Sequence, residues 1–172
     1  VLHRDVKPAN VLLTDDGRPY LADFNVSIRG DVLADRQLGG TIPYMAPEHL
    51  AAFLGRTAAR DDVDHRADVY ALGATLYELL TLTPAVDGAD KQEILKKIAF
   101  EEPDAPRKLD RAIPAELETV ALKCLAKNPA ERYATAGDLA DDLRHWLADK
   151  PIRAKRPGWR ERLAKWTRRH KY

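Results

Sequence analysis

Four polar side chains near the start of the chain have the types and spacing needed to bind a metal ion and move a proton. Asp5, Lys7 and Asn10 lie close together, so one short loop offers a carboxylate base, a cation and an amide oxygen. We expect the following turn to centre on residues 16–17 (DG), which would place Asn10 opposite Asp23 across a hairpin. Oxygen ligands that meet in this way suit Mg²⁺, which binds a few protein oxygens together with substrate phosphates. Taken singly, each of these residues is also an ordinary turn or cap residue.

A β-hairpin and a set of helices must position these side chains. Two short β-prone runs flank the turn, and the region that follows is rich in glycine and proline and is predicted to be a loop. Apolar periodicity and proline breaks then predict a series of helices. The predicted strands cover residues 11–14 and 19–22, the loop covers 26–45, and the helices cover 46–54, 65–82, 90–99, 114–127 and 135–149. The sequence therefore predicts a mainly α fold with a small β-hairpin.

The helix predicted over residues 65–82 has a clear start signal and an apolar face. Asp64 is the expected N-cap, because a short carboxylate side chain can accept the first free N–H groups of a helix. We expect most of the residues that recur at helical spacing to be buried. These are Val69, Leu72, Gly73, Leu76, Leu79 and Leu80.

Length and composition narrow the class of protein. The chain has 172 residues, of which 45% are hydrophobic and 32% charged, values typical of one globular domain. The single cysteine, Cys124, cannot form an internal disulfide, which favours a reducing compartment. The chain starts at Val1, and Met45 is its only methionine. A motif-rich segment begins at residue 3. We therefore expect it to be a piece of a longer protein.

Three short motifs follow one another in a fixed order. They are residues 3–10 (HRDVKPAN), 23–25 (DFN) and 46–48 (APE). In this order and spacing they resemble the catalytic loop, the metal-binding motif and the end of the activation segment of protein kinases. The resemblance implies the C-terminal lobe of the α+β protein kinase fold, without its N-terminal lobe.

Later residues extend the resemblance. Asp68 resembles the anchoring aspartate of the family's central helix, and Arg132 resembles the late arginine that pairs with Glu48. We expect the lobe to cover residues 1–149, and residues 150–172 to form a separate basic tail.

The resemblance implies a role for each matched residue in transferring the γ-phosphoryl group of ATP to protein hydroxyls. Asp5 would accept or orient the proton of the substrate hydroxyl, and Lys7 would neutralise charge on the transferred group. Asn10 and Asp23 would hold Mg²⁺ at the ATP phosphates, and Leu12 would lie under the adenine ring. A lysine two residues after the aspartate is typical of serine/threonine kinases, so Ser and Thr side chains of proteins are the implied substrates.

The other matched residues are implied to be structural or regulatory. Thr41 resembles the threonine that contacts the catalytic aspartate and lysine, and His3 and Phe24 match positions that stack in a structural spine. Arg4 resembles an arginine that often pairs with a phosphorylated loop residue. Residues 28–40 contain no Ser, Thr or Tyr, so we expect no phosphorylation in the middle of this loop.

The chain departs from the family's pattern in two ways. Asn25 stands where the metal-binding motif normally has glycine, although asparagine tolerates a left-handed backbone better than most residues. The glycine-rich loop, strand lysine and partner glutamate of a kinase precede the catalytic loop, and here only Val1 and Leu2 do. We expect the chain alone to be inactive and its longer parent, with an N-terminal lobe, to be active. The alternative is a pseudokinase-like lobe that binds partners without transferring phosphate.

Charge is divided unevenly along the chain. Residues 153–172 contain nine basic residues and one acidic residue, a net charge of +8. Residues 1–152 contain 19 basic and 26 acidic residues, a net charge of −7. Such asymmetry is typical of a tail that meets an anionic partner.

Trp159, Leu163 and Trp166 recur at helical spacing within the tail, which predicts a basic amphipathic helix. Such a helix either lies on an anionic membrane surface or docks its tryptophans on the lobe. The tail also resembles the juxtamembrane linker of bacterial receptor-type kinases. We expect a cytoplasmic protein, with any membrane attachment through a transmembrane segment outside this chain, and no nucleic-acid partner because the body is acidic.

Overall fold

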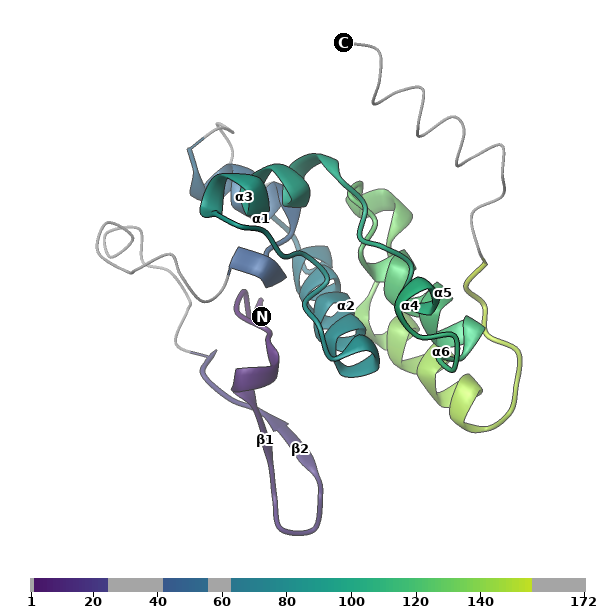
Figure 1. Ribbon diagram of the computed structural model, residues 1–172. Helices are drawn as coiled ribbons and strands as arrows, with labels where there is room; N and C mark the ends of the chain where they lie inside the picture. Colours follow the sequence, from purple (N-terminus) through teal and green to yellow (C-terminus); the bar gives the residue numbers. More distant parts are fainter. Residues whose placement is uncertain (1, 25–41, 56–62, 156–172) are drawn as a thin grey trace.

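The computed structural model describes residues 2–24, 42–55 and 63–155 (Figure 1). A hairpin projects from one side of a helical body. In chain order the elements are η1 (Pro8–Asn10), β1 (Val11–Leu13), β2 (Pro19–Leu21), η3 (Ile42–Tyr44), α1 (Pro47–Phe53), α2 (Arg66–Thr81), α3 (Lys91–Phe100), α4 (Pro106–Leu109), α5 (Ala115–Cys124), η5 (Pro129–Glu131) and α6 (Ala136–Leu147), where η marks a short 3₁₀ helix. The predicted mainly α fold with a two-stranded antiparallel hairpin is confirmed.

All five predicted helices are present, with ends shifted by one to three residues. The short helices η1, η3, α4 and η5 were not predicted. Pro106 occupies the first turn of α4, where proline is favoured, so a residue interpreted as a helix breaker also begins a helix. The predicted N-cap of α2 is wrong by one residue. His65 holds the cap position, while the Asp64 carboxylate accepts the N–H of Arg66 at 2.8 Å.

The hairpin register also differs from the prediction by one residue. The N–H of Ala22 donates to the carbonyl of Asn10 at 2.8 Å, so Asn10 lies opposite Ala22, and its predicted pairing with Asp23 is wrong. The cause is a three-residue loop in place of the expected two-residue turn. Gly17 donates its N–H to the carbonyl of Thr14 at 2.8 Å and has a φ of 77°. This left-handed residue gives the type I turn with a bulge that three-residue hairpin loops adopt.

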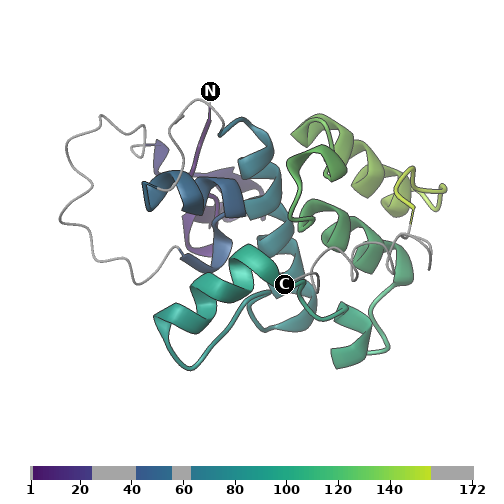
Figure 2. The ribbon, with the colours of Figure 1, turned by 90° about the horizontal axis from the view of Figure 1, so that it is seen from above.

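Helix α2 lies at the centre of the body, between the N-terminal segments and the α5–α6 pair (Figure 2). Val69 and Tyr70 have no exposed surface, and Tyr77 is also buried. Most of the face predicted to be buried is at least half-buried, but Leu79 is 66% exposed, against the prediction. The core on this side of the body is formed instead by Tyr70, Ala74 and Tyr77, which recur at helical spacing along α2.

Gly73 lets α2 and α5 approach closely. A Cβ at this position would clash with the Cβ of Cys124, because it would lie closer than two non-bonded carbon atoms can approach. Cys124 is fully buried, and burial raises the pKa of its thiol to about 12. The cysteine is therefore a packing residue and stays protonated.

The segment after α6 packs back onto the body. The buried Asp142 carboxylate accepts the N–H groups of Arg153 at 2.7 Å and Ala154 at 2.9 Å, and the Tyr133 hydroxyl at 2.8 Å. Burial disfavours the charged carboxylate, but these hydrogen bonds outweigh it and lower the pKa of Asp142. Ala154 is buried beside Val69, so the chain is fixed to the body up to this point. Within the described ranges, no helix has the length and hydropathy needed to cross a membrane.

Candidate active site

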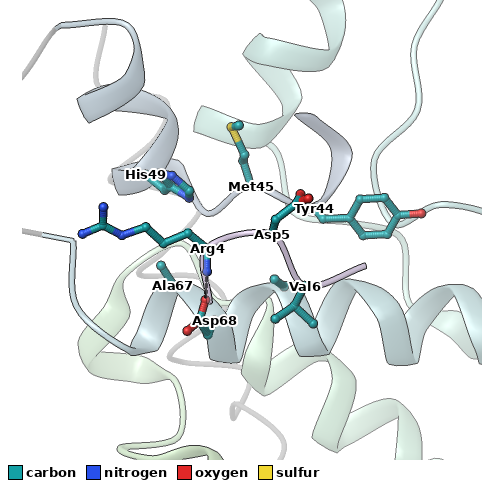
Figure 3. Close-up of a pocket in the computed structure, with 9 residues that line it drawn as sticks. Arg4, Asp5, Val6, Tyr44, Met45, His49, Ala67 and Asp68 are labelled. Carbon is teal, nitrogen blue, oxygen red and sulfur yellow. Dashed lines mark hydrogen bonds between the residues drawn. The ribbon is translucent and has the colours of Figure 1, made fainter. Parts of the chain in front are cut away.

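Helix α2 positions the loop that contains Asp5. Asp68, in the first turn of α2, accepts the backbone N–H groups of His3 and Arg4, each at 2.8 Å. Figure 3 shows the second of these hydrogen bonds. Arg4 has a φ of 65°, a left-handed conformation that costs free energy in a residue with a side chain. The two hydrogen bonds to Asp68 hold this turn, so the carboxylate of a distant helix sets the direction of the loop.

Asp5, Lys7 and Asn10 form a compact polar cluster. Asp5 Oδ2 accepts from Lys7 Nζ at 2.8 Å and from Asn10 Nδ2 at 3.0 Å, and Asn10 Nδ2 also donates to the Asp5 carbonyl at 2.8 Å. Asp5 and Asn10 are buried. Asp5 Oδ1 is buried too, and among the described residues no donor reaches it. One carboxylate oxygen is thus held in place, and the other is oriented as a free acceptor.

His3 connects this loop to the end of the hairpin. Its Nδ1 accepts the N–H of Asp5 at 3.3 Å, so its Nε2 carries the hydrogen and donates to the carbonyl of Ala22 at 3.0 Å. The ring centroids of His3 and Phe24 lie 4.7 Å apart, tilted by 60°. Because both ring nitrogens form hydrogen bonds within the protein, His3 is a packing residue that stabilises the loop.

Asn10 and Asp23 are the side chains with oxygen atoms suited to Mg²⁺. The amide nitrogen of Asn10 is used twice by Asp5, which leaves its amide oxygen as the end available to a cation. Asp23 is exposed, with a φ of 62°, one residue beyond the Ala22 that pairs with Asn10. The described residues contain no cluster of three or more His, Cys, Asp or Glu that could hold a metal. Two oxygens fit Mg²⁺, because it takes few protein ligands and completes its shell with water and phosphate oxygens.

Three other residues singled out in the sequence are not part of this cluster, and two of them lie outside the residues that the structure describes. Leu12 lies on β1 and is 57% exposed. Thr41 and Asn25 lie outside the described residues.

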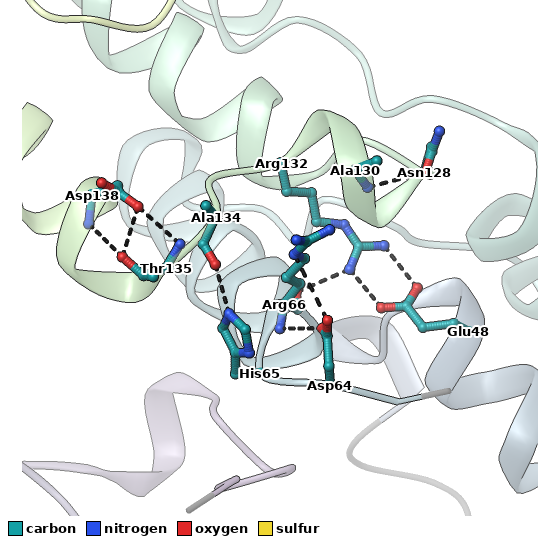
Figure 4. A network of polar contacts seen from close by, with 10 residues as sticks. All are labelled: Glu48, Asp64, His65, Arg66, Asn128, Ala130, Arg132, Ala134, Thr135 and Asp138. Atoms are coloured by element: carbon teal, nitrogen blue, oxygen red, sulfur yellow. Dashed lines mark hydrogen bonds and ion pairs between the residues drawn. The ribbon is translucent and has the colours of Figure 1, made fainter. Parts of the chain in front are cut away.

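Glu48 and Arg132 form the ion pair that the resemblance to protein kinases implies (Figure 4). Arg132 Nη1 and Nη2 donate to the two Glu48 carboxylate oxygens at 2.6 and 2.8 Å. The remaining N–H groups of this buried guanidinium donate to backbone carbonyls, including that of Arg66 at the start of α2. The pair joins α1 to the segment before α6.

Sequence reasoning missed His49. It lies on α1 and lines a small cavity together with Arg4, Asp5 and Met45 (Figure 3). Burial, reinforced by the charge of Arg4, lowers the pKa of His49, and the nearby carboxylates only partly oppose this. No spacing or motif links position 49 to the Asp5 loop, because tertiary packing alone brings them together.

Known proteins share these features of sequence. The protein kinase domain matches residues 1–144. The chain is 35% identical over 159 residues to a probable serine/threonine-protein kinase of Streptomyces coelicolor, a match that covers 90% of this chain. It is 35% identical over 148 residues to the serine/threonine-protein kinase PknB of Mycobacterium tuberculosis, covering 83% of this chain.

A third relative is named as a tyrosine kinase. The chain is 36% identical over 152 residues, or 87% of its length, to the tyrosine-protein kinase MasK of Myxococcus xanthus. In all three cases the match spans 22% of the relative's length. The chain therefore belongs to the protein kinase domain family and is a member related to the bacterial serine/threonine kinases.

Proposed function

We propose that these residues form the catalytic loop and metal-binding motif of an ATP-dependent protein serine/threonine kinase. The observation that carries the proposal is the state of the Asp5 carboxylate. Its Oδ2 is fixed by Lys7 and Asn10, and its buried Oδ1 has no donor among the described residues. A buried acceptor held in this way is suited to receive a hydrogen bond from a substrate hydroxyl.

The reaction transfers a phosphoryl group from ATP to a protein hydroxyl. The bond between the γ-phosphorus and the bridging oxygen of ADP breaks, and a new bond forms between this phosphorus and the substrate oxygen. Asp5 Oδ1 orients the hydroxyl and accepts its proton. Lys7, 2.8 Å from Asp5 Oδ2, provides positive charge beside the transferred group.

Asn10 and Asp23 would hold Mg²⁺, which supplies charge neutralisation at the ATP phosphates when bound. The role of the chain is to keep the Asn10 amide oxygen turned away from Asp5, as the two hydrogen bonds from its nitrogen do. Leu12, exposed on β1, would provide part of the apolar floor under the adenine ring.

Lys7 favours serine and threonine as acceptors, because a lysine two residues after the aspartate is typical of serine/threonine kinases. One relative is named as a tyrosine kinase, so the type of acceptor residue must be tested by experiment. The natural full-length protein that carries these residues should be incubated with radiolabelled ATP, a mixed protein substrate and Mg²⁺. We expect phosphoserine and phosphothreonine after acid hydrolysis and no transfer when EDTA is present. Phosphotyrosine as the main product would contradict the assignment.

A second candidate is a lobe that binds partners without transferring phosphate. The observation in its favour is Asn25, which replaces the glycine of the metal-binding motif. The same assay separates the two functions. A wild-type protein that binds Mg-ATP but transfers nothing, and gains transfer on Asn25→Gly, would support the non-catalytic interpretation.

A further inference from the structure

A groove on the helical body lies outside the Asp5 site. It is lined by the end of α2, the connection from α2 to α3, the end of α3 and the connection that leads into α4. Its apolar lining comes from Tyr77, Pro84, Ala85, Val86, Pro103 and Leu109. Leu109 is 55% exposed, and Tyr77 and Val86 are buried. The groove therefore has an apolar floor that is partly open to solvent.

The rim of this groove is acidic. Four acidic side chains line it against one lysine, Lys97, whose ammonium group is bound by Glu93 at 2.7 Å. The four acids are exposed, and among the described residues two of them form ion pairs with exposed lysines: Glu101 with Lys96 at 3.5 Å and Asp104 with Lys108 at 2.8 Å. Exposed pairs of this kind contribute little to stability and exchange readily for another cation. The four acids are Asp87, Glu101, Glu102 and Asp104.

The composition of the C-terminal tail is complementary to the groove. Residues 156–172 contain seven basic residues and one acidic residue. Trp159, Leu163 and Trp166 are the large apolar residues among them. A segment of this kind can place tryptophan on an apolar floor and lysine or arginine on an acidic rim.

The anchored end of the body places the tail within reach. Ala154 packs beside Val69 on α2, and Tyr77 of the groove lies eight residues further along the same helix. Eight residues of helix correspond to about 12 Å. The 17 residues from 156 to 172 span up to about 56 Å when extended and about 25 Å as a helix. Both lengths exceed the distance along α2 between Val69 and Tyr77.

We propose that residues 156–172 dock in cis in this groove, with Trp159 and Trp166 on its apolar floor and the basic side chains on its acidic rim. The tail is then a ligand of the lobe, held by a contact that salt weakens. Release of the tail would expose the groove to a second basic segment. This inference does not depend on the proposed phosphoryl transfer.

Carbodiimide coupling of carboxylates to amines in the full 172-residue chain tests the contact. At low ionic strength we expect Lys165 and Lys171 to be joined within one molecule to the groove acids. The double variant Glu101→Lys, Asp104→Lys should lose the couplings to the two remaining acids, Asp87 and Glu102. The control variant carries the same charge change on two exposed acids away from the groove, Asp15→Lys and Glu116→Lys, and should keep the couplings.

The indole N–H resonances of Trp159 and Trp166 give an independent readout. In the wild-type chain we expect them to lie away from random-coil positions, and to return there in the groove variant and in about 1 M salt, where the Debye length is about 3 Å. A thermal unfolding curve close to that of the wild type would show that the groove variant is folded. Random-coil indole signals that move only when phosphatidylserine vesicles are added would overturn the proposal in favour of membrane binding. Couplings between chains, or to acids outside the groove, would overturn it as well.

Discussion

Arg132 and Glu48 lie 84 residues apart in the sequence, yet their side chains meet in a two-point ion pair with N–O distances of 2.6 and 2.8 Å. The Arg132 side chain has no exposed surface, and the Glu48 side chain is 17% exposed. The pair lies between α1 and the segment that leads into α6, so it joins the region after the Asp5 site to the rest of the body.

Replacing Arg132 by alanine should strongly destabilise the fold. It leaves the Glu48 carboxylate without its partner in a largely buried place, which typically costs about 3–5 kcal/mol. Chemical denaturation of the chain measures the change. The control is Arg144→Ala, because the Arg144–Asp141 pair is 71% and 47% exposed and should contribute at most about 1 kcal/mol. Equal losses of unfolding free energy in Arg132→Ala and Arg144→Ala would contradict the greater contribution assigned to the buried pair.

Two glycine-to-alanine substitutions should have opposite effects. At Gly73 the added methyl group clashes with the Cβ of Cys124, so overpacking should cost at least about 1–3 kcal/mol. At Gly137, in the first turn of α6, the nearest atom is Thr135 Oγ1 at 3.4 Å, and alanine should stabilise the helix by up to about 1 kcal/mol. Thermal unfolding of both variants gives the comparison. A neutral Gly73→Ala variant would mean that α2 and α5 are packed less closely than described.

His49 should make the fold sensitive to mild acid. Its pKa is lowered in the folded chain from an ordinary value of 6.5, so the unfolded chain binds a proton at a higher pH than the folded chain does. The stability that His49 contributes is present above pH 6.5 and is lost as the pH falls toward its folded pKa. We expect His49→Gln to flatten the fall in unfolding free energy between about pH 7.5 and 5.5.

Denaturation of both proteins at several pH values measures this slope, with the exposed His65→Gln as the control. An unchanged slope in His49→Gln would contradict the burial and charge assigned to this side chain.

Local spacing predicts much of this site, and tertiary packing explains the rest. Asp5, Lys7 and Asn10 meet because they belong to one loop, and the hairpin follows from an Asp-Gly turn. The register was wrong because the same turn sequence serves loops of two or three residues, and only the Thr14–Gly17 hydrogen bond decides between them.

Contacts between distant elements were harder to predict. The place of Arg132 beside Glu48 came from resemblance to a family and not from residue periodicity, and the hydrogen bonds from the backbone of His3 and Arg4 to Asp68 were not predicted. His49 matched no pattern, since its surroundings depend on how α1 packs against the Asp5 loop. The exposure of Leu79 was missed because an apolar residue at helical spacing does not reveal which side of a helix end is covered.

The role of Asp5 is tested most directly by Asp5→Asn in the natural full-length protein. This substitution preserves size and removes the proton acceptor, so phosphoryl transfer from Mg-ATP should fall by about 10²–10⁴-fold while nucleotide binding is kept. Asp15→Asn, on the exposed hairpin turn, is the matched control and should transfer phosphate at the wild-type rate. A folded Asp5→Asn protein with the wild-type rate would contradict the assignment of Asp5 as the residue that accepts the substrate proton.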